Sequence, residues 1–146
     1  METDVMKLFL RLARQSANGF SCAQILMATA LQDEEKENPD LLRAVGGLNM
    51  GYGYNGGPCG ALTGGCCMIS YYAGKGEPEE LEDPNLEEML GEYARWFNGK
   101  AGGEYGGNCC DAILDGDKNN KLVRCPMLIQ ECYLKVMEIL RKYEVL

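Results

Sequence analysis

Cysteine is the residue type with the most chemical potential in this chain, which has eight cysteines and no histidine. Without an imidazole, neither a Ser-His-Asp triad nor a Cys-His pair can form, so a nucleophile or redox centre must rely on thiols. In a reducing compartment, this many cysteines indicates thiol redox chemistry or metal binding rather than a structural disulfide framework. The eight are Cys22, Cys59, Cys66, Cys67, Cys109, Cys110, Cys125 and Cys132.

Most of these cysteines coincide with the predicted starts of helices. Backbone N–H groups without partners and the positive end of the helix dipole favour a thiolate there, so we expect pKa values below the usual value of about 8.5. The thiolate is both the attacking species in disulfide exchange and the metal ligand. The cysteines at predicted helix starts are Cys22 after Ser21, Cys59 after Pro58, Cys109 and Cys110 after Asn108, and Cys125 before Pro126.

Cys59 is the predicted attacking thiolate, because the glycines around it leave room for a partner to approach. Cys66, Cys67 and Cys132 lie deep in predicted helices, where packing is the usual role of cysteine. Cys66 follows Cys59, and Cys132 follows Cys125, at a spacing of two helical turns. Each pair would share one helix face, so a resolving role stays open. Neither adjacent pair is expected to form a disulfide, because the small ring is strained.

The elements that must position these thiols are helices. Apolar spacing, caps and breakers predict helices over 3–17, from 21 onwards, from 39 over a short stretch, 58–72, 84–97, 109–114 and 126–143. Asn98-Gly99 is expected to end the fifth of these, with a loop over 100–107. No convincing strand pattern appears. The predicted fold class is therefore all-α, an irregular bundle of about six to seven helices in a single domain over residues 1–146.

The predicted helix over 58–72 contains Gly60, Gly64 and Gly65. Each glycine lowers intrinsic helix stability by roughly 1 kcal/mol against alanine. We expect compensation from another helix that packs closely against this flat surface.

The composition excludes several classes of function. The net charge of −8 argues against nucleic acids and anionic membrane surfaces as partners. No apolar run approaches the roughly 20 residues of a membrane span, so a membrane-embedded protein is not expected. The acidic start, Met1-Glu2-Thr3-Asp4, does not resemble a secretory signal, and we expect a cytoplasmic protein. A homo-oligomer is left open.

The order and spacing of the cysteines resemble the C_GCAxxG_C_C family, small proteins described as redox-active and named for four cysteines and a Cys-Gly-Ala-x-x-Gly motif. The resemblance extends from about Asp4 to Leu140 and implies a helical fold and redox activity. It implies functional positions at Cys22, Cys59, Cys110 and Cys125, although Cys109 could replace Cys110. The matching segments are GFSCAQ at 19–24, CGALTG at 59–64, CDAIL at 110–114 and RCP at 124–126.

Three functions follow as alternatives. The first is a thiol–disulfide redox protein whose partner is a protein or small-molecule thiol or disulfide, with oxidoreductase activity left open. The second is a zinc or iron–sulfur module held by the same four cysteines, although their spacings match no standard ligand run. The third, suggested only by the resemblance, is a non-enzymatic helical partner of a transport system. A thioredoxin fold is not expected, because Cys-x-x-Cys and strand patterns are missing, and the disulfide pairing stays open.

Overall fold

The computed structural model describes residues 2–146, which form seven α-helices and two short 3-10 helices. No β-strand occurs among these residues, although Pro58 and Cys109 form one isolated antiparallel bridge. The predicted all-α fold class is therefore confirmed. The elements are α1 (Glu2–Ala17), α2 (Cys22–Asp33), α3 (Pro39–Val45), η1 (Gly46–Leu48), α4 (Gly60–Ala73), α5 (Leu86–Tyr105), α6 (Cys110–Leu114), η2 (Lys118–Asn120) and α7 (Lys121–Lys142).

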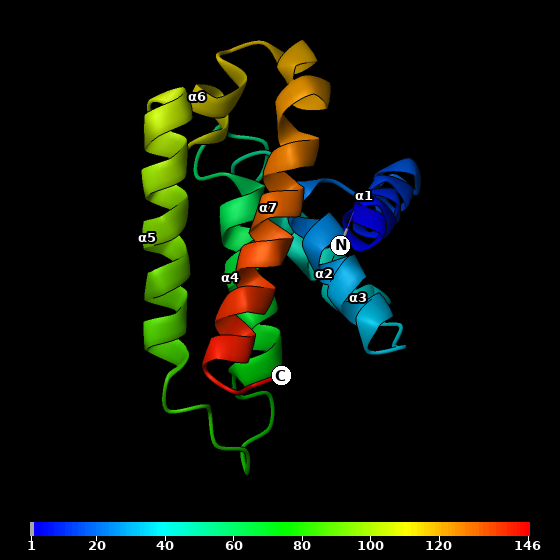
Figure 1. The fold of residues 1–146 in the computed structure, drawn as a ribbon, viewed down its shortest axis with the longest axis vertical. Helices are drawn as coiled ribbons and strands as arrows, with labels where there is room; N and C mark the ends of the chain where they lie inside the picture. Colours follow the sequence, from blue (N-terminus) through cyan, green and yellow to red (C-terminus); the bar gives the residue numbers. More distant parts are fainter. Residues whose placement is uncertain (1) are drawn as a thin grey trace.

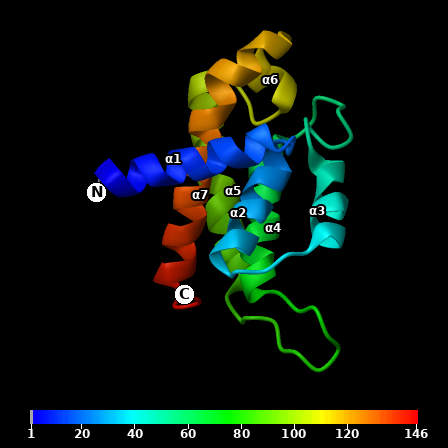
Figure 2. The same ribbon diagram turned by 90° about the vertical axis from the view of Figure 1, so that its right-hand side faces the viewer.

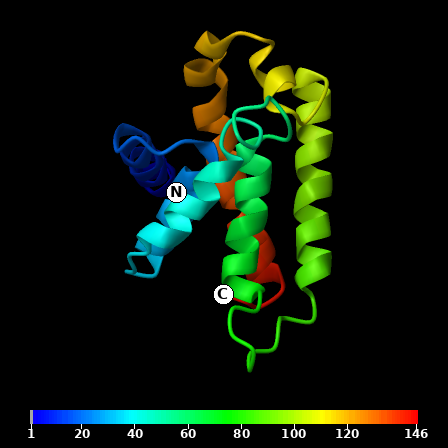
Figure 3. The ribbon, with the colours of Figure 1, turned by 180° about the vertical axis from the view of Figure 1, so that it is seen from behind.

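Three long helices, α4, α5 and α7, run side by side, and each contacts the other two (Figure 1). α2 packs along α4, and α1 crosses α7 and also contacts α2 (Figure 2). Seen from behind, α6 and the starts of α4 and α7 gather at one end of the bundle (Figure 3). None of the helices within residues 2–146 combines the length and the apolar character needed to cross a bilayer.

Close packing of α4 against α2 and α5 explains two of the glycines in α4. A Cβ atom on Gly64 would lie 2.7 Å from the Ala23 Cα, and one on Gly65 would lie 2.2 Å from the Tyr93 hydroxyl oxygen. Both Ala23 and Tyr93 are completely buried. The expectation that tight helix packing compensates for the helix-weakening glycines is confirmed, and this packing sets the position of the start of α2 beside the start of α4.

Helix α5 continues past the predicted stop, so the expected loop over 100–107 is wrong for most of its length. Ala101 is completely buried in the core. Lys100 forms ion pairs with Glu104, at 2.7 Å, and with Glu131 of α7. These tertiary and local contacts outweigh the helix-breaking tendency of Asn98-Gly99, and the helix ends where Gly106 adopts a left-handed conformation with a φ of 80°.

Helix α7 begins at Lys121, earlier than predicted, and contains Pro126 in its interior. The prediction that Cys125 is an N-cap is therefore wrong, because Cys125 lies in the second turn of the helix. Pro126 is tolerated there because only the carbonyl of Leu122 loses its helical partner. Leu122 is exposed, so water can bind that carbonyl.

Contacts with α6 explain the early start of α7. The Asn120 side chain donates a hydrogen bond to the Leu114 carbonyl at 2.8 Å. The Arg124 guanidinium donates to the Ile113 carbonyl at 2.7 Å. Both bonds are accepted by carbonyl groups at the end of α6, and they hold the first turn of α7 against that end.

Candidate thiol site

The four cysteines implied by the sequence come from four different helix regions. Cys22 is the first residue of α2, as predicted, and Cys59 is the N-cap of α4 rather than its first helical residue. Cys110 is the first residue of α6, with Cys109 as the N-cap. Only Cys125 lies away from a helix start, within α7. All eight cysteines lie within the described residues, and all are free thiols.

Cys22 is the common neighbour of the other three. Burial is the main cause of the raised pKa of Cys59, of Cys110 and of Cys125, and a negative charge on Cys22 raises each of these pKa values further. After burial and Cys22, Cys110 also raises the pKa of Cys125. The four thiols thus form one electrostatic neighbourhood around Cys22, although none of them is in a disulfide.

Backbone contacts hold the starts of α4 and α6 together. The Cys59 N–H donates to the Asn108 carbonyl at 2.9 Å, and the Cys110 N–H donates to the Gly57 carbonyl at 2.7 Å. Cys110 is buried, whereas its neighbour Cys109 is half-buried.

The sulfur of Cys22 has several polar neighbours. The Met50 backbone N–H donates to Sγ at 3.5 Å, and the Ser21 hydroxyl donates to it at 3.9 Å. The thiol in turn approaches the Asn49 side-chain oxygen at 4.0 Å. That oxygen also accepts a hydrogen bond from the Ala23 N–H at 3.2 Å, so buried Asn49 joins the loop before α4 to the start of α2.

The loop that supplies the Met50 N–H has an unusual backbone. Five consecutive residues, 50–54, have positive φ angles, and three of them are not glycine: Met50 at 55°, Tyr52 at 42° and Tyr54 at 63°. Such a conformation costs roughly 1–2 kcal/mol for each L-residue with a Cβ. Strain of this kind often marks a functional segment, and here it directs a backbone donor to the Cys22 sulfur.

The expected lowering of thiol pKa values is wrong for Cys59, Cys110 and Cys125. Burial raises the pKa of Cys59, and the Ala61 N–H, which donates to its sulfur at 3.4 Å, only partly opposes this effect. Burial also raises the pKa of Cys110. For Cys125 burial raises the pKa to about 11, despite the opposing charge of Lys121. Desolvation of the thiolate therefore outweighs the helix start and the nearby cation.

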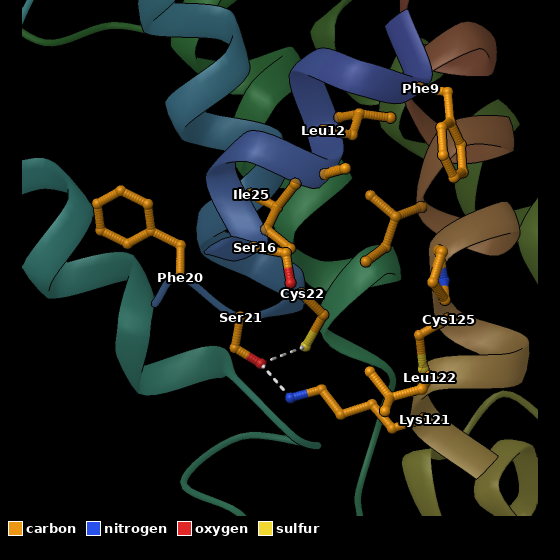
Figure 4. Close-up of a pocket in the computed structure, with 13 residues that line it drawn as sticks. Phe9, Leu12, Ser16, Phe20, Ser21, Cys22, Ile25, Lys121, Leu122 and Cys125 are labelled. Atoms are coloured by element: carbon orange, nitrogen blue, oxygen red, sulfur yellow. Dashed lines mark hydrogen bonds between the residues drawn. The ribbon is translucent and has the colours of Figure 1, made fainter. Parts of the chain in front are cut away.

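Cys22 and Cys125 line the same pocket, between α1, α2 and the beginning of α7 (Figure 4). Its volume is about 200 Å³. Lys121 also lines it, and its ammonium group donates to the Ser21 hydroxyl at 3.1 Å. Most of the remaining wall is apolar and includes Phe9, Leu12, Phe20, Ile25 and Ile129.

The other cysteines fit packing roles. Cys132 is completely buried, and burial raises its pKa to about 12. Burial raises the pKa of Cys66 to about 11 and also raises that of Cys67. Cys132 nevertheless lies close enough to Cys59 to influence its pKa, so the core offers Cys59 a second thiol neighbour.

The zinc or iron–sulfur alternative gains no support from the geometry. Across residues 2–146, no three cysteine or carboxylate side chains are placed to share a metal ion. The metal role of Cys22, Cys59, Cys110 and Cys125 stays a prediction.

Sequence reasoning missed three contributors to the site. Lys121 belongs to α7 rather than to a loop, and its place beside the pocket depends on the early start of that helix. Asn49 and Met50 belong to a glycine-rich segment that was expected only to be irregular. The alternation of glycine and tyrosine after Met50 is the one local signal, because glycine readily adopts positive φ angles.

One family model matches most of the chain. The model described as "Putative redox-active protein (C_GCAxxG_C_C)" matches residues 20–139, a segment that contains all eight cysteines. No curated protein and no solved structure matches the chain. The match covers far more than half of the chain, which therefore belongs to the C_GCAxxG_C_C family.

Proposed function

We propose that this protein carries out thiol–disulfide exchange, with Cys22 as the attacking thiol and Cys125 as the resolving thiol. The observation that carries the proposal is that these two cysteines share one pocket, with Lys121 between their helices. A partner that enters the pocket would meet both sulfurs. Cys59 and Cys110 would be secondary partners, since both lie in the electrostatic neighbourhood of Cys22.

The surroundings of Cys22 favour it over Cys59 as the attacking residue. Two donors face its sulfur, the Met50 N–H and the Ser21 hydroxyl. Lys121 donates to that same hydroxyl, so a cation supports the second donor. These groups would face the negative charge that the attacking sulfur carries. For Cys59, which the sequence favoured, burial raises the pKa more than the backbone N–H groups of Ala61 and Leu62 lower it.

The exchange proceeds in two balanced steps. The Cys22 thiolate attacks one sulfur of a partner disulfide, whose S–S bond breaks, and the first partner thiolate leaves and takes up a proton. Cys125 then loses its proton and attacks the Cys22 sulfur, which releases the second partner thiolate. The partner disulfide is reduced to two thiols by two electrons, and the Cys22 and Cys125 thiols are oxidised to a disulfide.

Closure of this disulfide requires the two sulfurs to approach to about 2.05 Å. The segment of α7 that carries Cys125 is suited to such a movement. Pro126 removes one backbone hydrogen bond from the helix beside Cys125. We expect this loss to ease a local shift of Cys125, while the bond from Arg124 to α6 keeps the start of the helix in place.

The test is to equilibrate the protein in thiol–disulfide buffers of increasing potential, count the remaining thiols and map the disulfide by mass spectrometry. We expect two thiols to disappear together and a link between Cys22 and Cys125. Cys125 and Cys132 share one tryptic peptide, so fragmentation must separate them. Cys22→Ser and Cys125→Ser should each abolish the link, whereas the control Cys67→Ser should retain it.

Two results would contradict the proposal. One is that all eight thiols persist at oxidising potentials. The other is a disulfide that forms normally in the Cys22→Ser variant.

A further inference from the structure

We infer that the pocket beside Cys22 and Cys125 selects a small disulfide. The substituent on one of its sulfurs is an apolar group, about the size of a single ring, that itself bears a carboxylate. This inference rests on the proposed thiol–disulfide function and specifies the substrate class. Three features support the inference: the volume of the pocket, its apolar wall, and the positive charge of Lys121 near the two cysteines.

The volume of the pocket limits the size of the ligand's apolar substituent. The pocket measures about 200 Å³. An apolar protein cavity of about 150 Å³ is large enough to bind benzene. The pocket therefore accommodates one aromatic ring or a short alkyl chain, whereas a tripeptide such as glutathione is too large to enter it completely.

The side chains that line the pocket favour an apolar substituent on the ligand. Phe9 and Leu12 of α1, Phe20 of the turn that follows, and Ile25 and Ile129 of α2 and α7 contribute apolar surface. Close contact with such side chains favours an apolar ligand group through the hydrophobic effect.

The positive charge of Lys121, which lines the pocket with Cys22 and Cys125, favours a ligand with an anionic group. The chain has 22 acidic residues, yet no acidic residue lines this pocket. Lys121 lines it, and none of the ion pairs formed within the described part of the chain involves Lys121. Its ammonium has three N–H groups and uses one for Ser21, which leaves donors for a carboxylate.

A probe that cannot undergo exchange separates this inference from the proposed function. We would titrate 2-(methylthio)benzoate, a thioether whose carboxylate lies next to its sulfur, into the reduced protein and measure binding by NMR chemical shifts. Thioanisole, which lacks the carboxylate, is the comparison ligand. We expect saturable binding of the benzoate, with shifts concentrated at the pocket residues, and binding of thioanisole weaker by roughly tenfold, as expected for loss of a charge-assisted hydrogen bond.

Two substitutions test the two parts of the site. Ala13 is exposed and lines the pocket, so Ala13→Trp should fill it and weaken both ligands at least about tenfold. Ala17→Trp, on the same helix but outside the pocket, is the matched control and should change neither affinity.

Lys121→Gln should weaken binding of the benzoate by roughly tenfold and leave binding of thioanisole unchanged, and Lys121→Arg should restore binding of the benzoate.

The results distinguish failure of the inferred substrate class from failure of the proposed exchange function. If the Cys22–Cys125 disulfide forms but 2-(methylthio)benzoate does not bind, the inferred substrate class is wrong and the exchange function stands. If the benzoate binds as described but no disulfide forms, the exchange function fails. Binding that is insensitive to Ala13→Trp and to Lys121→Gln would also overturn the inference, because the ligand would then occupy another part of the surface.

Discussion

A Cβ atom placed on Gly60 would lie 2.3 Å from the Cys22 sulfur. The first residue of α4 and the first residue of α2 are therefore in direct contact through a backbone carbon and a thiol. This contact leaves no space for any side chain at position 60, and it fixes Cys22 beside Cys59, which immediately precedes Gly60.

Gly60→Ala tests this contact. The added methyl group must displace the Cys22 sulfur or the α4 backbone, so we expect the free energy of unfolding to fall by about 1–3 kcal/mol. Chemical denaturation would measure the change. Gly99→Ala is the matched control, because Gly99 lies within a helix and no atom within 4 Å would meet its Cβ. That control should be neutral or stabilising by up to about 1 kcal/mol, and an equal effect of both substitutions would contradict the role assigned to Gly60.

The strained loop before α4 gives a second prediction. Tyr54 has a φ of 63° and its side chain is exposed, so Tyr54→Gly should relieve backbone strain at little cost in packing. We expect the free energy of unfolding to rise by about 0.5–1 kcal/mol, measured by chemical denaturation. Tyr54→Ala is the control, because it removes the same ring but keeps a Cβ at the left-handed position. If alanine stabilises the protein as much as glycine does, the gain comes from the ring and not from the backbone.

Helical periodicity was sufficient to predict the fold class and most of the helices, because each amphipathic helix carries its own pattern. It failed at the end of α5 and at the start of α7, where Asn98-Gly99 and Cys125-Pro126 are strong local breakers. At both places contacts with another helix decide the outcome: Lys100 pairs with Glu131, and Arg124 binds the Ile113 carbonyl. Such contacts join residues that local sequence windows do not compare.

The site was predictable in its residue types but not in its electrostatics. Sequence position correctly placed Cys22 at a helix start. The choice of Cys22, Cys59, Cys110 and Cys125 rests on the family resemblance and stays a prediction. The pKa of a thiol, however, depends on how much water it retains, and burial is a property of the whole fold. The helix start at Cys59 contributes a real hydrogen bond from Ala61, yet desolvation has the larger effect.

The ion pairs of Lys100 give a third prediction, concerning the last turn of α5. Lys100→Ala should lower the free energy of unfolding by about 1 kcal/mol, because the pairs with Glu104 and Glu131 are partly exposed. Amide hydrogen exchange over residues 101–105 should become faster, since Lys100 helps to continue α5 past Gly99. The difference in stability should shrink in high salt. Lys75→Ala, at an exposed position outside the helices, should leave this exchange unchanged.

The buried thiols predict loss of stability at alkaline pH. Burial raises the pKa of Cys125 to about 11 and that of Cys132 to about 12. In the unfolded chain both thiols should ionise near pH 8.5. Above that pH the unfolded state binds fewer protons than the folded state, so the free energy of unfolding must fall as the pH rises. The stabilising contribution is complete below about pH 8.5 and is lost progressively toward the folded-state pKa values.

Urea denaturation of the reduced protein between pH 7 and pH 10.5 would measure this dependence. Cys125→Ser removes one titrating group, so its free energy of unfolding should fall less steeply above about pH 8.5 than that of the unmodified protein. Ser16→Ala is a suitable control, because Ser16 lines the same pocket and does not titrate in this range. An identical slope in the Cys125→Ser variant would mean that Cys125 ionises equally easily in both states, and hence that its sulfur is open to water.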